Sequence, residues 1–169
     1  MRLFVAINLE ENMKEAIMDI QASMMFLGMQ GNFTKPDNMH LTLAFIGEYP
    51  DPDMVVESIG ELKADPFEIR LEGLGSFGKL WWVGIQKNES LAQVVRVLRR
   101  RLAEGDIPFD RKKFKPHITI VRKPHGGEAY RPDKEAGRLP EASMVVGHIS
   151  LMRSDRGKHG MIYTELGSV

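Results

Sequence analysis

The chain has 169 residues, of which 43% are hydrophobic and 27% are charged, a composition typical of a folded globular domain rather than a disordered chain. It contains no cysteine, which excludes disulfides, thiol catalysis and thiolate metal sites. Lys plus Arg and Asp plus Glu both total 23, so bulk charge gives no case for binding along a nucleic-acid backbone. No apolar run is as long as the stretch of about 18 residues that is needed to span a bilayer, and no signal peptide is evident. We therefore expect a cytoplasmic protein without membrane contact.

The first third of the chain predicts two strands and a helix. Residues 3–9 are mostly apolar, as in a strand that is buried on both faces. Residues 10–27 carry apolar side chains at spacings of four and three, which predicts an amphipathic helix. A second strand is expected at residues 41–46, and Gly47 is expected to end it.

The middle of the chain predicts a helix and two further strands. Asp51-Pro52 is typical of a helix start, with buried positions expected at Val55, Ile59 and Leu62. Residues 67–71 alternate apolar and charged side chains, which predicts a half-buried strand. Residues 73–78 include three glycines and predict a flexible connection, and residues 80–85 predict another strand.

The last part of the chain begins with a capped helix. Asn88 precedes an apolar stripe at helical spacing, which comprises Leu91, Val94, Val95, Leu98 and Leu102. A strand is expected to begin at His117, and residues 123–140, which are polar and rich in Gly and Pro, predict a long surface loop. Residues 144–152 and 161–166 predict two strands joined by a turn.

This order of elements favours an α+β fold with largely antiparallel sheets. Two segments, His40-Leu41-Thr42-Leu43 and His117-Ile118-Thr119-Ile120, share one pattern, and each follows a helix and a short approach segment. We interpret them as the two copies of a duplicated unit. Residues 1–169 are therefore expected to form one bilobal domain, with both motifs facing a central cleft and the helices on the outer faces.

The two motifs carry the chemistry. Successive side chains of a strand point to opposite faces, so His40 shares a face with Thr42, and His117 shares a face with Thr119. Two imidazoles across a groove can act as general acid and general base near neutral pH. The threonine hydroxyls can hydrogen-bond phosphoryl oxygens. These parts suffice to open a 2',3'-cyclic phosphate, and the sequence predicts no metal ligand set.

Three further residues are candidates for substrate contacts. Arg122 could hold an anion, but strict alternation would turn it away from His117, so this role requires a twist or bulge after Val121. Phe45 and Trp82 could stack on a terminal base, with core packing as the alternative because both lie in apolar strands.

The remaining histidines and other catalytic motifs add nothing to this site. His125 and His159 lie in polar turns, and His148 is expected on a strand in a structural role. No phosphate-binding glycine loop and no Gly-x-Ser-x-Gly elbow is present.

The tandem motifs resemble those of the 2H phosphoesterase superfamily, and they resemble most its RNA 2',3'-cyclic phosphodiesterase branch, also called the 2'-5' RNA ligases. The resemblance extends to the Arg2-Leu3-Phe4-Val5-Ala6 opening, Trp81-Trp82-Val83, the Phe114-Lys115-Pro116 approach and the closing hairpin of residues 151–163. It implies a bilobal α+β fold and an enzyme that uses neither metal nor cofactor. The substrates implied are RNA ends or nucleotides that bear a 2',3'-cyclic phosphate.

The resemblance also implies roles. The cyclic phosphate is hydrolysed to a 2'-phosphomonoester, with His117 as the proton acceptor that activates water and His40 as the proton donor to the 3' oxygen. Thr42, Thr119 and Arg122 would hold phosphate oxygens. The same chemistry in reverse would join RNA ends through a 2'-5' linkage without ATP.

Two alternatives stay open within this resemblance. One is a non-catalytic nucleotide-binding module, and the other is a phosphodiesterase for small cyclic nucleotides or 2',5'-oligoadenylates. A monomer is expected, because the two lobes already complete one another.

Overall fold

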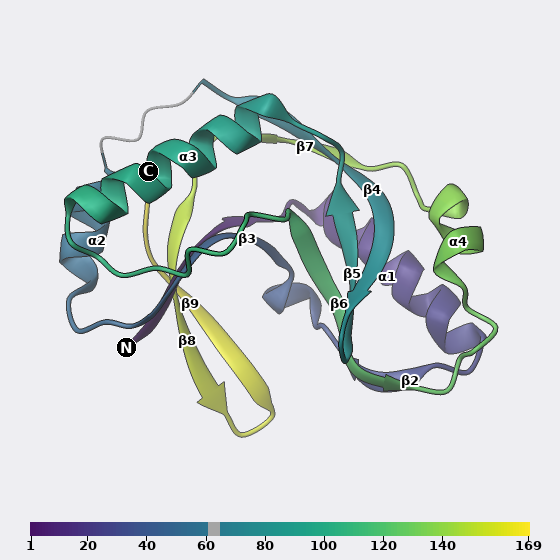
Figure 1. Ribbon diagram of the computed structural model, residues 1–169. Coiled ribbons are helices and arrows are strands. Elements are labelled where there is room, and N and C mark those ends of the chain that lie inside the picture. Colours follow the sequence, from purple (N-terminus) through teal and green to yellow (C-terminus); the bar gives the residue numbers. More distant parts are fainter. Residues whose placement is uncertain (61–64) are drawn as a thin grey trace.

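Two antiparallel sheets form the framework of the protein, which we describe from a computed structural model at residues 1–60 and 65–169 (Figure 1). The first sheet has the order β3-β1-β8-β9, with bounds His40–Glu48, Arg2–Asn8, Ser150–Gly157 and Gly160–Ser168. The second has the order β2-β6-β5-β4-β7, with bounds Gln30–Phe33, His117–His125, Leu80–Ile85, Phe67–Phe77 and Ser143–Val146. The predicted α+β fold with antiparallel sheets is confirmed.

The helices link the two sheets. They are α1 (Glu11–Phe26), α2 (Pro52–Ile59), α3 (Glu89–Glu104) and the short α4 (Pro132–Glu135), with 3-10 turns η1 (Pro36–Asn38) and η2 (Ala136–Arg138). Helix α1 follows a strand of the first sheet but contacts β6 and β7 of the second. Helix α3 follows a strand of the second sheet and contacts β3 of the first, beside α2 (Figure 1). The main cluster of buried side chains accordingly includes residues of both sheets.

The predicted helix signals correspond to observed contacts. All five apolar positions of the α3 stripe are buried, and the Asn88 side chain accepts a hydrogen bond from the Leu91 backbone N–H at 3.0 Å. The Asp51 carboxylate accepts one from the Met54 N–H at 3.2 Å, and Val55 is buried in α2. Leu62, the third position predicted to be buried in this helix, lies outside the described residues.

The secondary structure predicted from glycines is wrong at two places. The segment 73–78, predicted as a connection, is strand as far as Phe77, because Gly73 adopts a φ of +81° where the β4–β5 register shifts. Gly75 lies against the Trp82 ring, where a Cβ would collide with it. Gly47 does not end β3 either; with a φ of +85° it lies within the strand.

The C-terminal part also differs from the prediction. Residues 144–152 form two strands in different sheets, β7 and β8, because the chain crosses between the sheets at residues 147–149. His148 therefore lies in an exposed connection and not on a strand. The predicted loop at 123–140 contains the end of β6 together with α4 and η2.

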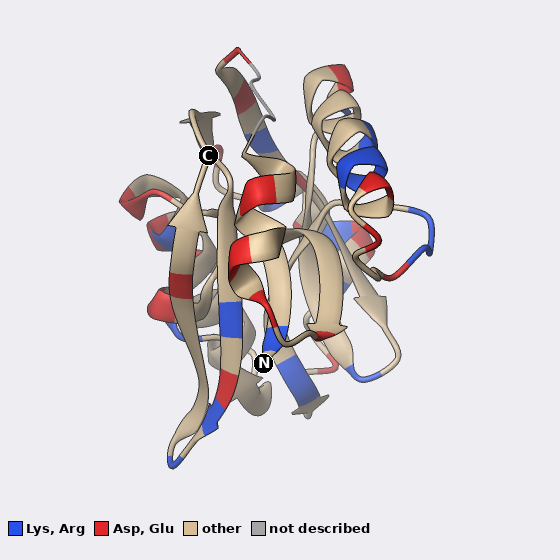
Figure 2. Ribbon diagram, turned by 90° about the vertical axis from the view of Figure 1, so that its left-hand side faces the viewer, with Lys and Arg blue, Asp and Glu red and all other residues tan. Residues whose placement is uncertain are grey.

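Charge is spread over the surface. Figure 2 shows acidic and basic residues on neighbouring strands and helices of one side, in keeping with the zero formal net charge. On α3, Arg96 pairs with Glu89 at 2.7 Å and Arg99 lies 5.8 Å from the centre of the Phe109 ring. No helix within residues 1–60 and 65–169 is long and apolar enough to cross a membrane.

Candidate active site

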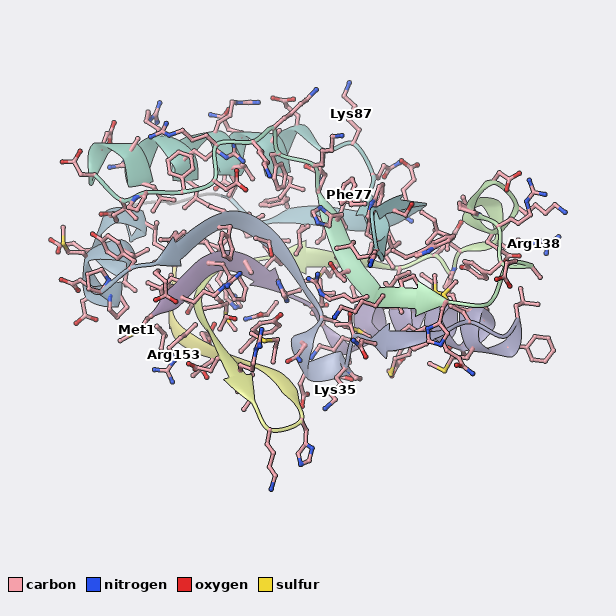
Figure 3. The ribbon with its side chains drawn as sticks, turned by 60° about the horizontal axis from the view of Figure 1, so that its bottom comes forward. Met1, Lys35, Phe77, Lys87, Arg138 and Arg153 are labelled. Carbon is pink, nitrogen blue, oxygen red and sulfur yellow. The ribbon has the colours of Figure 1, made fainter. Side chains whose placement is uncertain are left out.

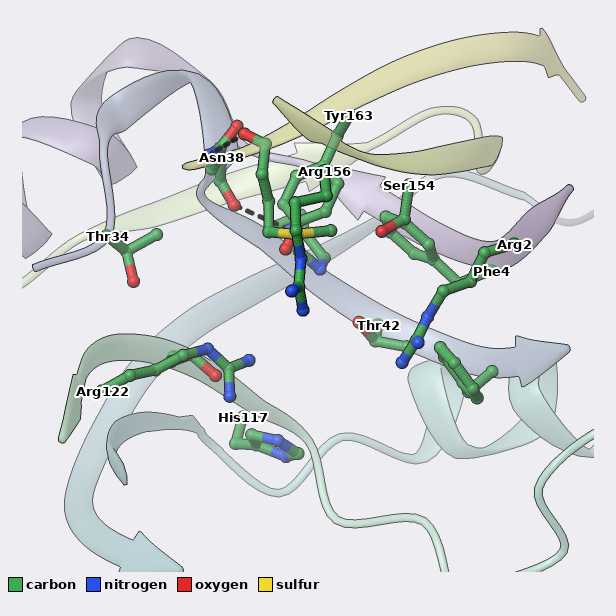
Figure 4. A pocket seen from close by; sticks show the side chains of 14 residues that line it. Arg2, Phe4, Thr34, Asn38, Thr42, His117, Arg122, Ser154, Arg156 and Tyr163 are labelled. Carbon is green, nitrogen blue, oxygen red and sulfur yellow. Dashed lines mark hydrogen bonds between the residues drawn. The ribbon is translucent and has the colours of Figure 1, made fainter. Parts of the chain in front are cut away.

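A pocket of about 360 Å³ lies between the two sheets, within the size range of small-ligand sites (Figure 4). It is lined by Arg2, Phe4, Thr34, Asn38, His40, Thr42, Phe45, His117, Thr119, Arg122, Ser154, Arg156, Met161 and Tyr163. Six of the seven predicted site residues are in this set, and Trp82 is not. The lining contains three arginines and no carboxylate, which favours an anionic ligand.

Both histidines are held in the same way. The Nδ1 atom of His40 lies 2.7 Å from the Asn38 carbonyl oxygen, and that of His117 lies 2.6 Å from the Lys115 carbonyl oxygen. Because a carbonyl oxygen only accepts, each Nδ1 carries the hydrogen and donates it. In each neutral ring, Nε2 is therefore the atom free to accept a proton.

Aromatic rings flank each imidazole. His40 contacts Phe4 at 4.9 Å and Tyr163 at 5.0 Å between ring centres. His117 contacts Phe77 at 5.1 Å and Trp82 at 6.2 Å. Trp82 thus lies against the ring of His117 and outside the pocket lining; its side chain is half-buried and is not part of the main buried cluster.

A β-bulge turns Arg122 toward the pocket. In the β5–β6 ladder, β6 has one more residue than β5 between Thr119 and Val121. Ile120 and Val121 are consequently both buried, and the alternation of faces restarts one residue later. Arg122 therefore shares the pocket with His117 and Thr119, as its predicted role requires.

The first motif has the same bulge. In the β1–β3 ladder, Leu43 is one of two extra residues of β3, so that Leu43 and Ala44 are both buried and Phe45 lines the pocket, 37% exposed. Phe45 therefore occupies the position in β3 that Arg122 occupies in β6. The correspondence between the two motifs extends from His-x-Thr to this sixth residue, which is an aromatic ring in β3 and a cation in β6.

The β8–β9 hairpin closes one side of the pocket. The Asn38 side chain donates to the Met161 carbonyl oxygen at 3.0 Å (dashed in Figure 4), and Lys35 donates to the His159 carbonyl oxygen at 2.9 Å. Lys35 lies beside this hairpin in Figure 3. Asn38 thus connects the hairpin to the segment that holds His40.

Several pocket residues carried no signal in the sequence. Arg2, Ser154 and Arg156 belong to no motif, and they reach the pocket because β1 lies beside β3 and β8 lies beside β1 in the first sheet. The resemblance extended over their segments but assigned them no role. Among the described residues, no group of three or more His, Cys, Asp or Glu side chains could hold a metal ion.

The pKa of His40 is lowered from its usual value near 6.5. The main cause is burial of the ring, and the positive charges of Arg122 and His117 act in the same direction. The hydrogen bond to the Asn38 carbonyl partly opposes them. In the free protein at neutral pH, His40 is therefore mainly the neutral imidazole.

This lowered pKa predicts a pH-dependent stability. Because the pKa of His40 is lower in the folded than in the unfolded protein, the unfolded chain binds this proton more tightly. The free energy of unfolding should therefore be unaffected by His40 above about pH 6.5 and should fall as the pH drops below that value. Chemical denaturation at several pH values measures this slope. His40→Asn should flatten it, whereas His125→Asn, at an exposed position, should not. An unchanged slope in His40→Asn would contradict the prediction.

The pocket brings together one imidazole and one threonine from each sheet, an arrangement that can supply acid–base chemistry to an anionic ligand. The sequence pattern of the 2'-5' RNA ligase superfamily matches residues 33–158, and the chain belongs to this superfamily.

Individual relatives agree with this assignment. The RNA 2',3'-cyclic phosphodiesterase of Thermotoga maritima is 29% identical, over 98% of this chain and 93% of that protein. The protein of the same name from Geobacillus stearothermophilus is 31% identical over 92% of this chain, which spans 52% of that relative's length. The crystal structure of Escherichia coli LigT in its apo form superimposes with a TM-score of 0.81 at 27% identity, over 99% of this chain and 95% of LigT.

Proposed function

We propose that the protein is an RNA 2',3'-cyclic phosphodiesterase that converts a terminal 2',3'-cyclic phosphate into a 2'-phosphomonoester. The observation that carries this proposal is a single pocket containing both His-x-Thr pairs and Arg122. The relatives named above bear this activity in their names, and Escherichia coli LigT was crystallised with 3'-AMP and with phosphate.

The proposed reaction is a displacement at phosphorus. Nε2 of His117 takes a proton from water as the water oxygen bonds to phosphorus, and the bond from phosphorus to the 3' oxygen breaks. The protonated Nε2 of His40 gives its proton to that 3' oxygen. Thr42, Thr119 and Arg122 donate hydrogen bonds to the non-bridging oxygens, whose charge increases in the transition state.

The substrate itself has a part in charging His40. A proton donor must be protonated before the reaction, yet the pKa of His40 is lowered in the free protein. The cyclic phosphate brings a negative charge next to Arg122 and offsets the repulsion from that guanidinium. We therefore expect substrate binding to be coupled to proton uptake at His40.

The same arrangement supports 2'-5' ligation of RNA ends. If an RNA 5' hydroxyl replaces water, His117 takes the proton of that hydroxyl, His40 again protonates the 3' oxygen that leaves, and the product is a 2'-5' linkage. We further propose that residues 1–169 act as one bilobal domain, since side chains of both sheets form its main buried cluster. We also propose that the protein is a cytoplasmic monomer and that it acts without a resident cofactor.

Product analysis tests the proposed activity. An oligoribonucleotide ending in a 2',3'-cyclic phosphate is incubated with the protein, and the product is assigned by phosphorus NMR. We expect only the 2'-phosphate, because the 3' oxygen is the leaving group. A 3'-phosphate would contradict the leaving-group assignment. Nucleotide binding without any hydrolysis would indicate a nucleotide-binding module instead.

A chelator tests the metal-free mechanism. In the proposed mechanism, two imidazoles supply the acid and the base, and a guanidinium stabilises the charge. We therefore expect EDTA at about 10 mM, a large excess over trace metal, to change kcat/KM less than about twofold. A large loss of activity that added divalent metal restores would contradict the mechanism.

A further inference from the structure

The pocket holds more positive charge than the reacting group needs. A 2',3'-cyclic phosphate is a diester with one negative charge, and Arg122, on the same strand as His117, already faces it. Arg2 and Arg156 also line the pocket, which has no acidic side chain. In a chain of zero net charge, this surplus calls for a second anionic group on the substrate.

Arg2 and Arg156 are available to such a group. Neither forms an ion pair or a side-chain hydrogen bond with the described part of the chain, unlike Arg153, which pairs with Asp155 at 2.8 Å. The Arg2 guanidinium lies 5.1 Å from the centre of the Phe45 ring. A cation–π contact of this kind orients the guanidinium without neutralising its charge.

Strand geometry brings these side chains together. Arg2 of β1 pairs with Ser154 of β8 in the first sheet. Ser154 and Arg156 are two residues apart, so they lie on one face of β8. Figure 4 shows Arg2 and Arg122 on opposite sides of the pocket, with the Arg156 side chain entering between them.

We infer that Arg2, Ser154 and Arg156 form a second phosphate subsite, which binds the phosphate on the 5' carbon of the terminal nucleotide. In an RNA end, this phosphate is the last internucleotide diester. Guanidinium groups suit it because they donate two parallel hydrogen bonds to phosphate oxygens, and the Ser154 hydroxyl can add a third. The inference rests on the proposed function and specifies its substrate as an oligonucleotide end in preference to a nucleoside cyclic phosphate.

The test compares substrates within each variant. The substrates are adenosine 2',3'-cyclic phosphate with a 5' hydroxyl, the same compound with a 5' phosphate, and the dinucleotide ApA ending in a 2',3'-cyclic phosphate. We expect Arg2→Gln and Arg156→Gln each to lower the ratio of kcat/KM for the dinucleotide to that for the 5'-hydroxyl compound by about tenfold. The ratio for the 5'-phosphorylated compound should fall similarly. Arg153→Gln, on the same strand as Arg156, is the matched control and should leave both ratios unchanged.

The outcomes separate the two proposals. Because each ratio is measured on one protein sample, partial misfolding of a variant cancels from it. A wild-type protein that hydrolyses none of the three substrates would overturn the proposed function. Hydrolysis with ratios that stay unchanged in both variants would overturn the subsite alone. A drop confined to the dinucleotide would also overturn it, because the contact would then be to the second nucleoside and not to the 5' phosphate.

Discussion

Replacing either His40 or His117 by Asn should lower kcat for cyclic phosphate hydrolysis by about 10³-fold, within the range that one general acid or base contributes. The double variant should lose little more, because the two imidazoles act on one transition state. Asn keeps a polar side chain of similar length. His125→Asn, which changes an exposed histidine, is the control, and retention of more than a tenth of the activity in either variant would exclude that imidazole from proton transfer.

A substrate with sulfur in place of the 3' oxygen assigns the two roles. A thiolate leaves without protonation, so the analogue should restore most of the rate lost in His40→Asn and little of that lost in His117→Asn. The opposite pattern would exchange the acid and the base. This experiment is decisive because both rings are held through Nδ1 in the same way and their geometry does not distinguish them.

Arg122→Gln should lower kcat/KM by about 10²-fold, because a charge-assisted donor to the developing phosphate charge is lost. It should also raise the pKa of His40, since the Arg122 charge is one of the causes that lower it. Steady-state kinetics and NMR titration of the His40 ring measure the two effects. Arg96→Gln on α3 is the control, because Arg96 pairs with Glu89 on the helix surface.

The rate loss and the shift of the His40 pKa in Arg122→Gln together test whether the β-bulge in β6 turns Arg122 toward the pocket. If Arg122 pointed away from the pocket, as strict alternation would have it, Arg122→Gln would change neither the rate nor the His40 titration. A rate loss with an unchanged His40 pKa would mean that Arg122 contacts substrate but does not act on the imidazole. Arg122→Lys should restore only part of the rate, because an ammonium cannot donate two parallel hydrogen bonds.

Local sequence patterns predicted several of the helices and strands. The apolar stripe of α3 and the caps at Asp51 and Asn88 depend on neighbours within a few residues, and they were predictable for that reason. Glycine was harder to interpret, because its effect depends on what it faces. Gly75 lies within strand β4, where the Trp82 ring occupies the space that a Cβ would need, and no local pattern shows that ring.

By itself, the sequence determined the two motifs and the sharing of a strand face by His40 and Thr42 and by His117 and Thr119. It also showed that Arg122 could join them only through a twist or bulge, which was expected after Val121 and lies one residue earlier, at Ile120. Only the tertiary structure decided which strands are neighbours. The order β3-β1-β8-β9 brings Arg2 and Arg156 into a pocket with histidines far away in the chain. The physical reason is that side-chain alternation is a property of one strand, whereas sheet order and bulge position arise from packing between distant segments.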